Sequence, residues 1–158
     1  MTSLERTVNT VVACPIVYGS MAVALGKKSE FATHKWTFYV RGPNFEDLSA
    51  FVSKVAFSLH PSFVVPVREI TEPPFEVTES GWGEFEGSIR IFFKDPDEHP
   101  IDLSHKILLY PMPGSPPATT KKPVVSEKYD EIIFTNPTHN FKSMLMQYTP
   151  PAEPYSGD

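Results

Sequence analysis

The sequence lacks most of the features that mark secreted, membrane and metal-binding proteins. Cys14 is the one cysteine in 158 residues, which excludes an internal disulfide framework and a cysteine zinc site. The N-terminus has neither the basic start nor the apolar stretch of a signal peptide. No apolar run approaches the ~18 residues that a membrane span needs. These absences predict an intracellular protein that does not enter a membrane.

An excess of positive charge is also missing. The net charge is −5, from 14 lysines and arginines against 19 aspartates and glutamates, and both signs are mixed along the chain. Because phosphate backbones are bound by basic faces, direct binding of nucleic acid is not expected. No basic cluster marks nuclear import, so a nuclear location would need another signal. The chain is 41% hydrophobic and 13% aromatic, which is enough for a real core.

Long helical patterns are scarce, and short alternating runs are frequent. In each run apolar and polar residues alternate, as in a strand with one buried and one wet face. Turn residues separate the runs at spacings near ten residues. This pattern predicts an all-β fold, an immunoglobulin-like antiparallel β-sandwich. The expected strands lie within residues 11–25, 35–40, 54–59, 75–78, 85–94 and 101–110. A single helical turn is expected at residues 47–52.

The composition changes after Tyr110, because nine of the 17 prolines lie in the last 48 residues. We therefore divide the chain into an N-terminal extension (1–13), a β domain (14–110) and a C-terminal part (111–158). The C-terminal part begins with a proline-rich linker, followed by an extended segment at 124–134 that can add a strand to the sandwich. Asn136 before Pro137 predicts the start of a short helix. Its apolar face is expected to carry Phe141, Met144, Leu145 and Tyr148.

Two loops carry the best candidates for a functional site. Each offers an aromatic residue beside small polar residues at the tip of a strand. Two facing aromatic side chains can sandwich a flat group, while a hydroxyl and backbone N–H groups bond its edge. Such a slot suits a planar amide better than a catalytic centre. The loops are residues 59–63 and 78–85, and they contain His60, Ser62, Phe63, Gly81, Trp82, Gly83 and Phe85.

Other interpretations of these residues stay open on sequence alone. His60 before a proline turn can cap a strand, and Trp82 and Phe85 can be core residues at a sheet edge. The remaining histidines show no metal-ligand spacing, so no metal site is expected. Ser62 and His60 do not form a catalytic triad, because no nucleophile elbow or oxyanion motif accompanies them. We predict no enzyme activity and no cofactor.

Three stretches of the sequence stand out together: HKWTFYVRG at 34–42, VAFSLHPSF at 55–63 and PPFEVTESGWGEF at 73–85. Together they resemble the YEATS domain, a family of acyl-lysine readers. The resemblance extends from about residue 17 to residue 110. Trp82, where other members have tyrosine, is similar to the Yaf-nine and glioma-amplified branch, as is the segment at 122–134.

The resemblance implies a role for each candidate residue. Phe63 and Trp82 would stack on the acyl amide, which is planar and neutral once acylation has removed the lysine charge. The Ser62 hydroxyl would bond the amide, and the Trp82 backbone N–H would bond the acyl carbonyl. His60 would hold the loop and line the wall. Gly81 and Gly83 would let the backbone approach the ligand closely, and Phe85 would close the floor.

The implied function is a reader of acetyl- or crotonyl-lysine on histone tails, with core histone three as the expected partner. The protein would act in the nucleus, as a subunit of a chromatin remodelling or histone acetyltransferase complex that regulates transcription. The alternative is a structural or histone-chaperone-like interaction module that does not depend on acylation. Two departures from the family stand out. Ala32 stands where family members carry an aromatic or histidine, so either Phe31 reaches the pocket in its place or that wall is open. The sequence stops at Asp158, where the related branch continues into a coiled coil.

Overall fold

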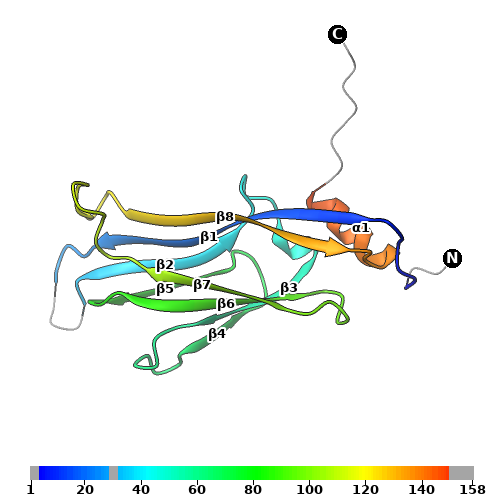
Figure 1. Cartoon of the computed structure of the whole chain (residues 1–158). Coiled ribbons are helices and arrows are strands. Elements are labelled where there is room, and N and C mark those ends of the chain that lie inside the picture. Colours follow the sequence, from blue (N-terminus) through cyan, green and yellow to red (C-terminus); the bar gives the residue numbers. More distant parts are fainter. Residues whose placement is uncertain (1–3, 29–31, 150–158) are drawn as a thin grey trace, which may run out of the picture.

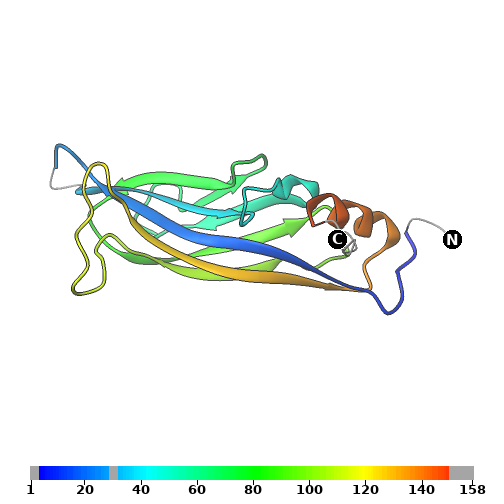
Figure 2. The ribbon, with the colours of Figure 1, turned by 90° about the horizontal axis from the view of Figure 1, so that it is seen from above.

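Two antiparallel sheets pack face to face in the computed structural model, which describes residues 4–28 and 32–149 (Figures 1 and 2). Within those residues each sheet has four strands, in the orders β5-β2-β1-β8 and β4-β3-β6-β7. This confirms the predicted all-β, immunoglobulin-like sandwich. The strands are β1 (Val11–Ala24), β2 (His34–Arg41), β3 (Val52–Ser58), β4 (Val67–Ile70), β5 (Glu76–Gly81), β6 (Phe85–Phe93), β7 (Ile101–Ile107) and β8 (Val124–Thr135). The helices are the 3-10 turn η1 (Leu48–Ala50) and α1 (His139–Tyr148).

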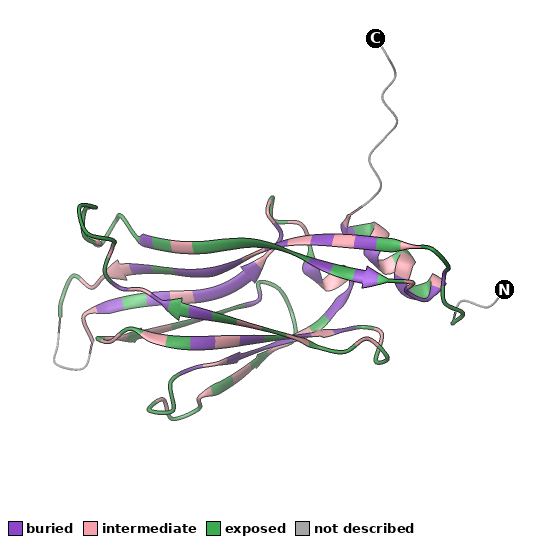
Figure 3. Cartoon of the chain, viewed as in Figure 1, coloured by how far each residue is buried: buried purple, intermediate pink, exposed green. Residues whose placement is uncertain are grey.

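The core lies between the two sheets and follows the alternation in the sequence. Along β6, Ile89 and Ile91 are buried while Glu86 and Arg90 face solvent, and β1 and β2 show similar stripes (Figure 3). Burying the apolar set of each strand removes it from water and fixes which face points inward. The largest fully buried side chains include Trp36, Phe38, Phe51, Phe57 and Phe141. β4 was not predicted; its four residues are half-buried or exposed and show no apolar stripe.

β8 completes one sheet by pairing with β1, from Val11 opposite Thr135 to Ala22 opposite Val124. The prediction that this segment adds a strand is confirmed. The two strands meet closely at Gly19, where a Cβ atom would lie 2.1 Å from the carbonyl oxygen of Ser126. A glycine is therefore required at this position for β8 to pass.

The helix α1 closes one end of the sandwich, with Phe141, Leu145 and Tyr148 buried and Met144 packed against the core. The predicted helical face is confirmed, but the predicted start at Asn136 is wrong. Thr138 is the N-cap, and its hydroxyl accepts a hydrogen bond from the Phe141 amide at 3.0 Å. Asn136 instead has φ 47°, and its side chain accepts from the Thr10 amide at 2.9 Å. That long-range bond holds the residue outside the helix.

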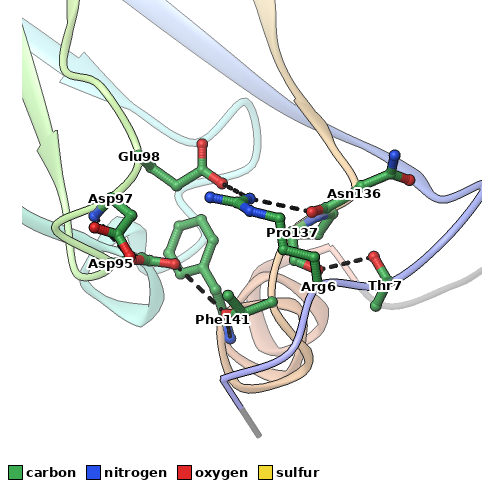
Figure 4. Close-up of polar contacts among 9 residues, drawn as sticks. Arg6, Thr7, Asp95, Asp97, Glu98, Asn136, Pro137 and Phe141 are labelled. Atoms are coloured by element: carbon green, nitrogen blue, oxygen red, sulfur yellow. Dashed lines mark hydrogen bonds and ion pairs between the residues drawn. The ribbon is translucent and has the colours of Figure 1, made fainter.

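The N-terminal segment is tied to the same end (Figure 4). The Arg6 guanidinium donates to Glu98 at 3.3 Å and to the carbonyl of Asn136 at 3.1 Å. The Thr7 amide and hydroxyl both donate to the Pro137 carbonyl, at 2.9 and 2.8 Å. The chain before β1 and the chain before α1 are thus held together.

β6 connects the two ends of the molecule. Its last residue, Phe93, contacts Phe134 of β8 and Phe141 of α1, at ring-centroid distances of 4.9 and 6.4 Å. Its first residue, Phe85, lies at the opposite end, where the β3–β4 and β5–β6 loops meet. Among residues 4–28 and 32–149, no helix is long and apolar enough to cross a membrane.

Candidate functional site

A pocket of about 300 Å³ opens between the β3–β4 and β5–β6 loops, at the end of the sandwich away from α1. All seven residues singled out from the sequence lie in its wall. We call this pocket the slot. It is lined by Trp36, His60, Ser62, Phe63, Ser80, Gly81, Trp82, Gly83, Glu84 and Phe85.

The β3–β4 loop is shaped by backbone hydrogen bonds. The Leu59 amide donates to the Pro66 carbonyl at 2.7 Å, which closes the base of the loop. The Phe63 amide donates to the His60 carbonyl at 3.1 Å, which makes a tight turn at the tip. The turn places His60, Ser62 and Phe63 on the slot side.

His60 sets the direction in which the Ser62 hydroxyl points. The backbone N–H of Ser62 donates to His60 Nδ1 at 3.1 Å, so this nitrogen acts as an acceptor. The Ser62 hydroxyl lies 2.8 Å from the same nitrogen and, in the tautomer with Nδ1 unprotonated, donates to it. Its oxygen keeps free lone pairs, which can accept a hydrogen bond from a ligand N–H.

Three aromatic rings form the inner wall of the slot. Phe63 and Phe85 are 5.9 Å apart between ring centroids, and Trp36 lies 5.9 Å from Phe63 and 5.4 Å from Phe85. These contacts fix Phe63 against the core, with its ring available at the slot. Trp82 stands on the opposite loop and is 66% exposed. A large apolar side chain held in the open is suited to covering a ligand.

The β5–β6 loop is anchored on both sides of Trp82. Before it, the Gly81 carbonyl accepts from the Thr33 amide at 3.0 Å. After it, the Glu84 carboxylate accepts from the amides of Leu109 and Tyr110, at 2.9 and 3.2 Å. Trp82 is therefore presented by a loop with fixed ends.

Sequence reasoning missed Trp36, Ser80 and Glu84 as lining residues. Trp36 is 1% exposed, and its indole nitrogen has no hydrogen-bond partner among the described residues. No local signal in the sequence marked Trp36, which stands on β2 opposite Glu79 of β5. Only the pairing of β2 with β5 brings it under the slot. Phe31, the other residue considered for this wall, lies outside the described residues.

The chemistry of the slot is that of a binding site for a neutral flat group. Glu84 is the one carboxylate among the ten lining residues, and two backbone amides already engage it. Within residues 4–28 and 32–149, no group of histidine, cysteine and acidic side chains is arranged to hold a metal ion. The Cys14 thiol is buried, and burial raises its pKa to about 12, so it stays protonated in the core.

Comparisons with known proteins agree on one family. A family model described as the YEATS family matches residues 31–111. The chain is 51% identical over 139 residues to transcription initiation factor TFIID subunit 14b of Arabidopsis thaliana, covering 87% of this chain and 52% of that protein. It is 37% identical over 164 residues to the protein AF-9 homolog of Saccharomyces cerevisiae, covering 91% of this chain and 73% of that protein.

Solved structures give the same result. The crystal structure of the Yaf9 YEATS domain bound to H3K27ac matches with a TM-score of 0.77 at 38% identity, over 90% of this chain and 98% of that one. The Yaf9 YEATS domain recognizing an H3K122suc peptide matches with a TM-score of 0.74 at 37% identity, over the same shares. The chain thus spans nearly all of a solved domain but about half of the Arabidopsis relative.

Proposed function

This chain belongs to the YEATS family, and on that premise we propose that it reads acylated lysine on histone tails. The acyl-lysine side chain would enter the slot between Phe63 and Trp82, which lie on different loops. The amide N–H would donate to the Ser62 hydroxyl oxygen, and the acyl carbonyl would accept from the Trp82 backbone N–H. Gly81 and Gly83 flank that N–H, and Phe85 lies behind the acyl group.

The observation that carries the proposal is the His60–Ser62 pair. Because His60 Nδ1 accepts the hydrogen bond that the Ser62 hydroxyl donates, the hydroxyl oxygen is left as an acceptor at the mouth of an aromatic pocket. An amide N–H fits this oxygen and a lysine ammonium fits less well. The ammonium must shed water to enter, and no free carboxylate lines the slot to receive it. Cation–π attraction to Trp82 offsets part of that cost.

The relatives support the wider setting. The Yaf9 YEATS domain was solved with H3K27ac and with an H3K122suc peptide, which points to histone three as the partner here. The Arabidopsis relative is a subunit of a transcription initiation factor. We infer that this protein works in the nucleus, within a chromatin-modifying or transcription complex, as a binding module and not as an enzyme.

The test is a matched series of one histone three peptide that carries lysine, acetyl-lysine, butyryl-lysine or crotonyl-lysine. Calorimetry should give a Kd of roughly 1–100 µM for the acetyl peptide, because a small slot buries little surface and the peptide must be ordered. The unmodified peptide should bind at least about tenfold more weakly. Crotonyl-lysine should match or exceed acetyl-lysine, since its flat chain extends the stacked surface, and butyryl-lysine should gain less.

The same titrations at two salt concentrations separate the alternative. A structural or histone-chaperone-like module would bind the unmodified peptide as tightly as the acylated ones, and its affinity would fall with salt. That result would overturn the reader proposal.

A further inference from the structure

A second concavity lies on the outer face of the sheet that contains β5 and β2. We call it the acidic groove; at about 640 Å³ it has more than twice the volume of the slot. Its apolar lining includes Met21, Phe45, Pro74 and Val125. Met21, Phe45 and Val125 are 40%, 77% and 51% exposed, so the groove presents apolar surface to solvent.

Phe45 is held in a conformation that a bulky side chain rarely adopts. Its φ is 62°, in the left-handed region, where a residue with a large side chain is strained. Arg41 fixes the surrounding turn by donating to the carbonyls of Gly42 and Pro43, at 3.0 and 3.1 Å. Its guanidinium also lies 4.4 Å from the centre of the Phe45 ring. Keeping the Phe45 ring exposed at the rim of the groove therefore costs conformational energy.

The charge around the groove is negative. Four carboxylates line it, from Glu46, Asp47, Glu76 and Glu127, against one cation, Arg41. Arg41 is already paired with Glu127 at 3.1 Å. The Glu76 side chain is exposed, and its carboxylate has no ion-pair or hydrogen-bond partner among the described residues. Lysine or arginine side chains beside an apolar residue would complement this surface.

The acidic groove and the slot lie along the same pair of strands, β2 and β5. Thr37 lines the groove, and its hydroxyl is hydrogen-bonded at 2.9 Å to that of Thr78, its partner on β5. Ser80, two residues further along β5, lines the slot. At ~3.3 Å per residue, ~7 Å of strand separates the two sites. Lys35, opposite Ser80, lies beside this path, so basic ligand residues are expected beyond it.

We propose that the histone tail whose acyl-lysine fills the slot runs along β5 and places a basic, apolar-containing flank in the acidic groove. This inference rests on the proposed reader function and names the second contact of the same ligand. From Trp82 to Glu76 the path is ~20 Å, or about six extended residues. The groove thereby selects acylated lysines by the sequence that surrounds them.

The experiment compares a short H3K27ac peptide, with about three residues on each side of the modified lysine, with longer forms. One is extended by about ten residues on the N-terminal side and another on the C-terminal side. One extended peptide should bind about tenfold more tightly than the short one, because the second contact becomes intramolecular. Replacing the lysines and arginines of that extension with glutamate should abolish the gain.

Three variants locate the gain. Glu76→Lys and Phe45→Ser should each remove most of it, while the affinity for the short peptide stays within about twofold. Glu86→Lys changes an exposed carboxylate on β6 outside both sites, and it should leave both affinities unchanged. In amide NMR spectra, Thr37, Tyr39 and Phe45 should shift with the extended peptide and not with the short one.

The two proposals fail in different ways. If the short acetylated peptide binds no better than its unmodified form, the reader function is wrong, and this inference falls with it. If the short peptide shows acyl dependence but neither extension tightens binding, the groove inference alone is wrong. It is equally wrong if the gain survives Glu76→Lys and Phe45→Ser.

Discussion

Ser62 is the residue whose removal reports most directly on the amide. The Ser62→Ala change deletes the acceptor oxygen but keeps the backbone N–H that bonds His60 Nδ1. We expect a loss of about 1 kcal/mol in binding acetylated peptide, roughly fivefold in Kd. Calorimetry with the wild type and the variant measures it. An unchanged Kd would remove Ser62 from the site.

Replacing Trp82 should weaken ligand binding without changing the stability of the fold. Its ring is 66% exposed and makes no ring contact with the core among the described residues, so the fold does not depend on it. Trp82→Ala should weaken acetyl-lysine binding by more than about tenfold, the loss expected when one face of an aromatic sandwich is removed. The urea midpoint should stay within experimental error of the wild type. A variant with full affinity would exclude Trp82 from stacking on the amide.

For single residues, the sequence could predict those site residues that lie close together along the chain. The seven predicted residues lie in two short segments of the chain, so each group forms a recognisable sequence motif. All seven line the slot. Trp36 looked like an ordinary strand residue, because its place under the slot depends on strand pairing across the sheet. The residues of the acidic groove come from five separate segments and leave no motif.

The pairing of β1 with β8 requires a glycine at position 19, where the two strands approach closely. In Gly19→Ala the new Cβ would collide with the Ser126 carbonyl oxygen, so β8 must move away from β1. We expect the free energy of unfolding to fall by about 1–3 kcal/mol, the range for overpacking. Hydrogen exchange of the β8 amides should also accelerate. Urea unfolding and exchange measure the two effects.

Gly83→Ala is the matched control for that substitution. A Cβ at Gly83 meets nothing within 4 Å, so its stability should equal that of the wild type. If both variants were equally stable, the close approach of β8 would not constrain the sheet.

Element boundaries were less predictable than the elements themselves. The alternation of apolar and polar residues located the apolar strands, because the character of each residue indicates whether it faces the core or the solvent. The start of α1 was misplaced because Asn136 and Pro137 carry a local helix-start signal, yet their polar groups bond the N-terminal segment instead. Long-range hydrogen bonds overrode a local preference. β4 escaped detection for a related reason, since a half-exposed edge strand needs no apolar stripe.

The whole molecule should become less stable in mild acid. His105 is buried between the sheets, 2.9 Å from the Ser20 hydroxyl, and burial, followed by the nearby Lys128 charge, lowers its pKa. Burial likewise lowers the pKa of His34. The unfolded chain, with histidine pKa values near 6.5, then binds more protons than the folded one. Stability from these groups is complete above that pH and is lost as the pH falls below it.

Urea unfolding between about pH 7.5 and pH 5 measures the effect. The free energy of unfolding should decrease with falling pH, and the slope should be shallower in His105→Gln. A slope that is identical in the variant would show that His105 titrates alike in both states.

The architecture was predictable at this scale and the strand order was not, because alternation gives each strand a face but not a neighbour.

The tie between the N-terminal segment and the start of α1 has a consequence for how the slot is displayed. Residues 4 and 149 both lie at the α1 end, and β6 spans the length from there to the slot, ~30 Å for nine residues. An attachment at residue 4 or residue 149 would therefore hold the molecule at the α1 end and leave the loops of the slot at the opposite, free end. A protein or fluorophore attached at either of these residues should therefore leave peptide binding undisturbed. A copy of the protein tethered there would present its slot to nearby histone tails.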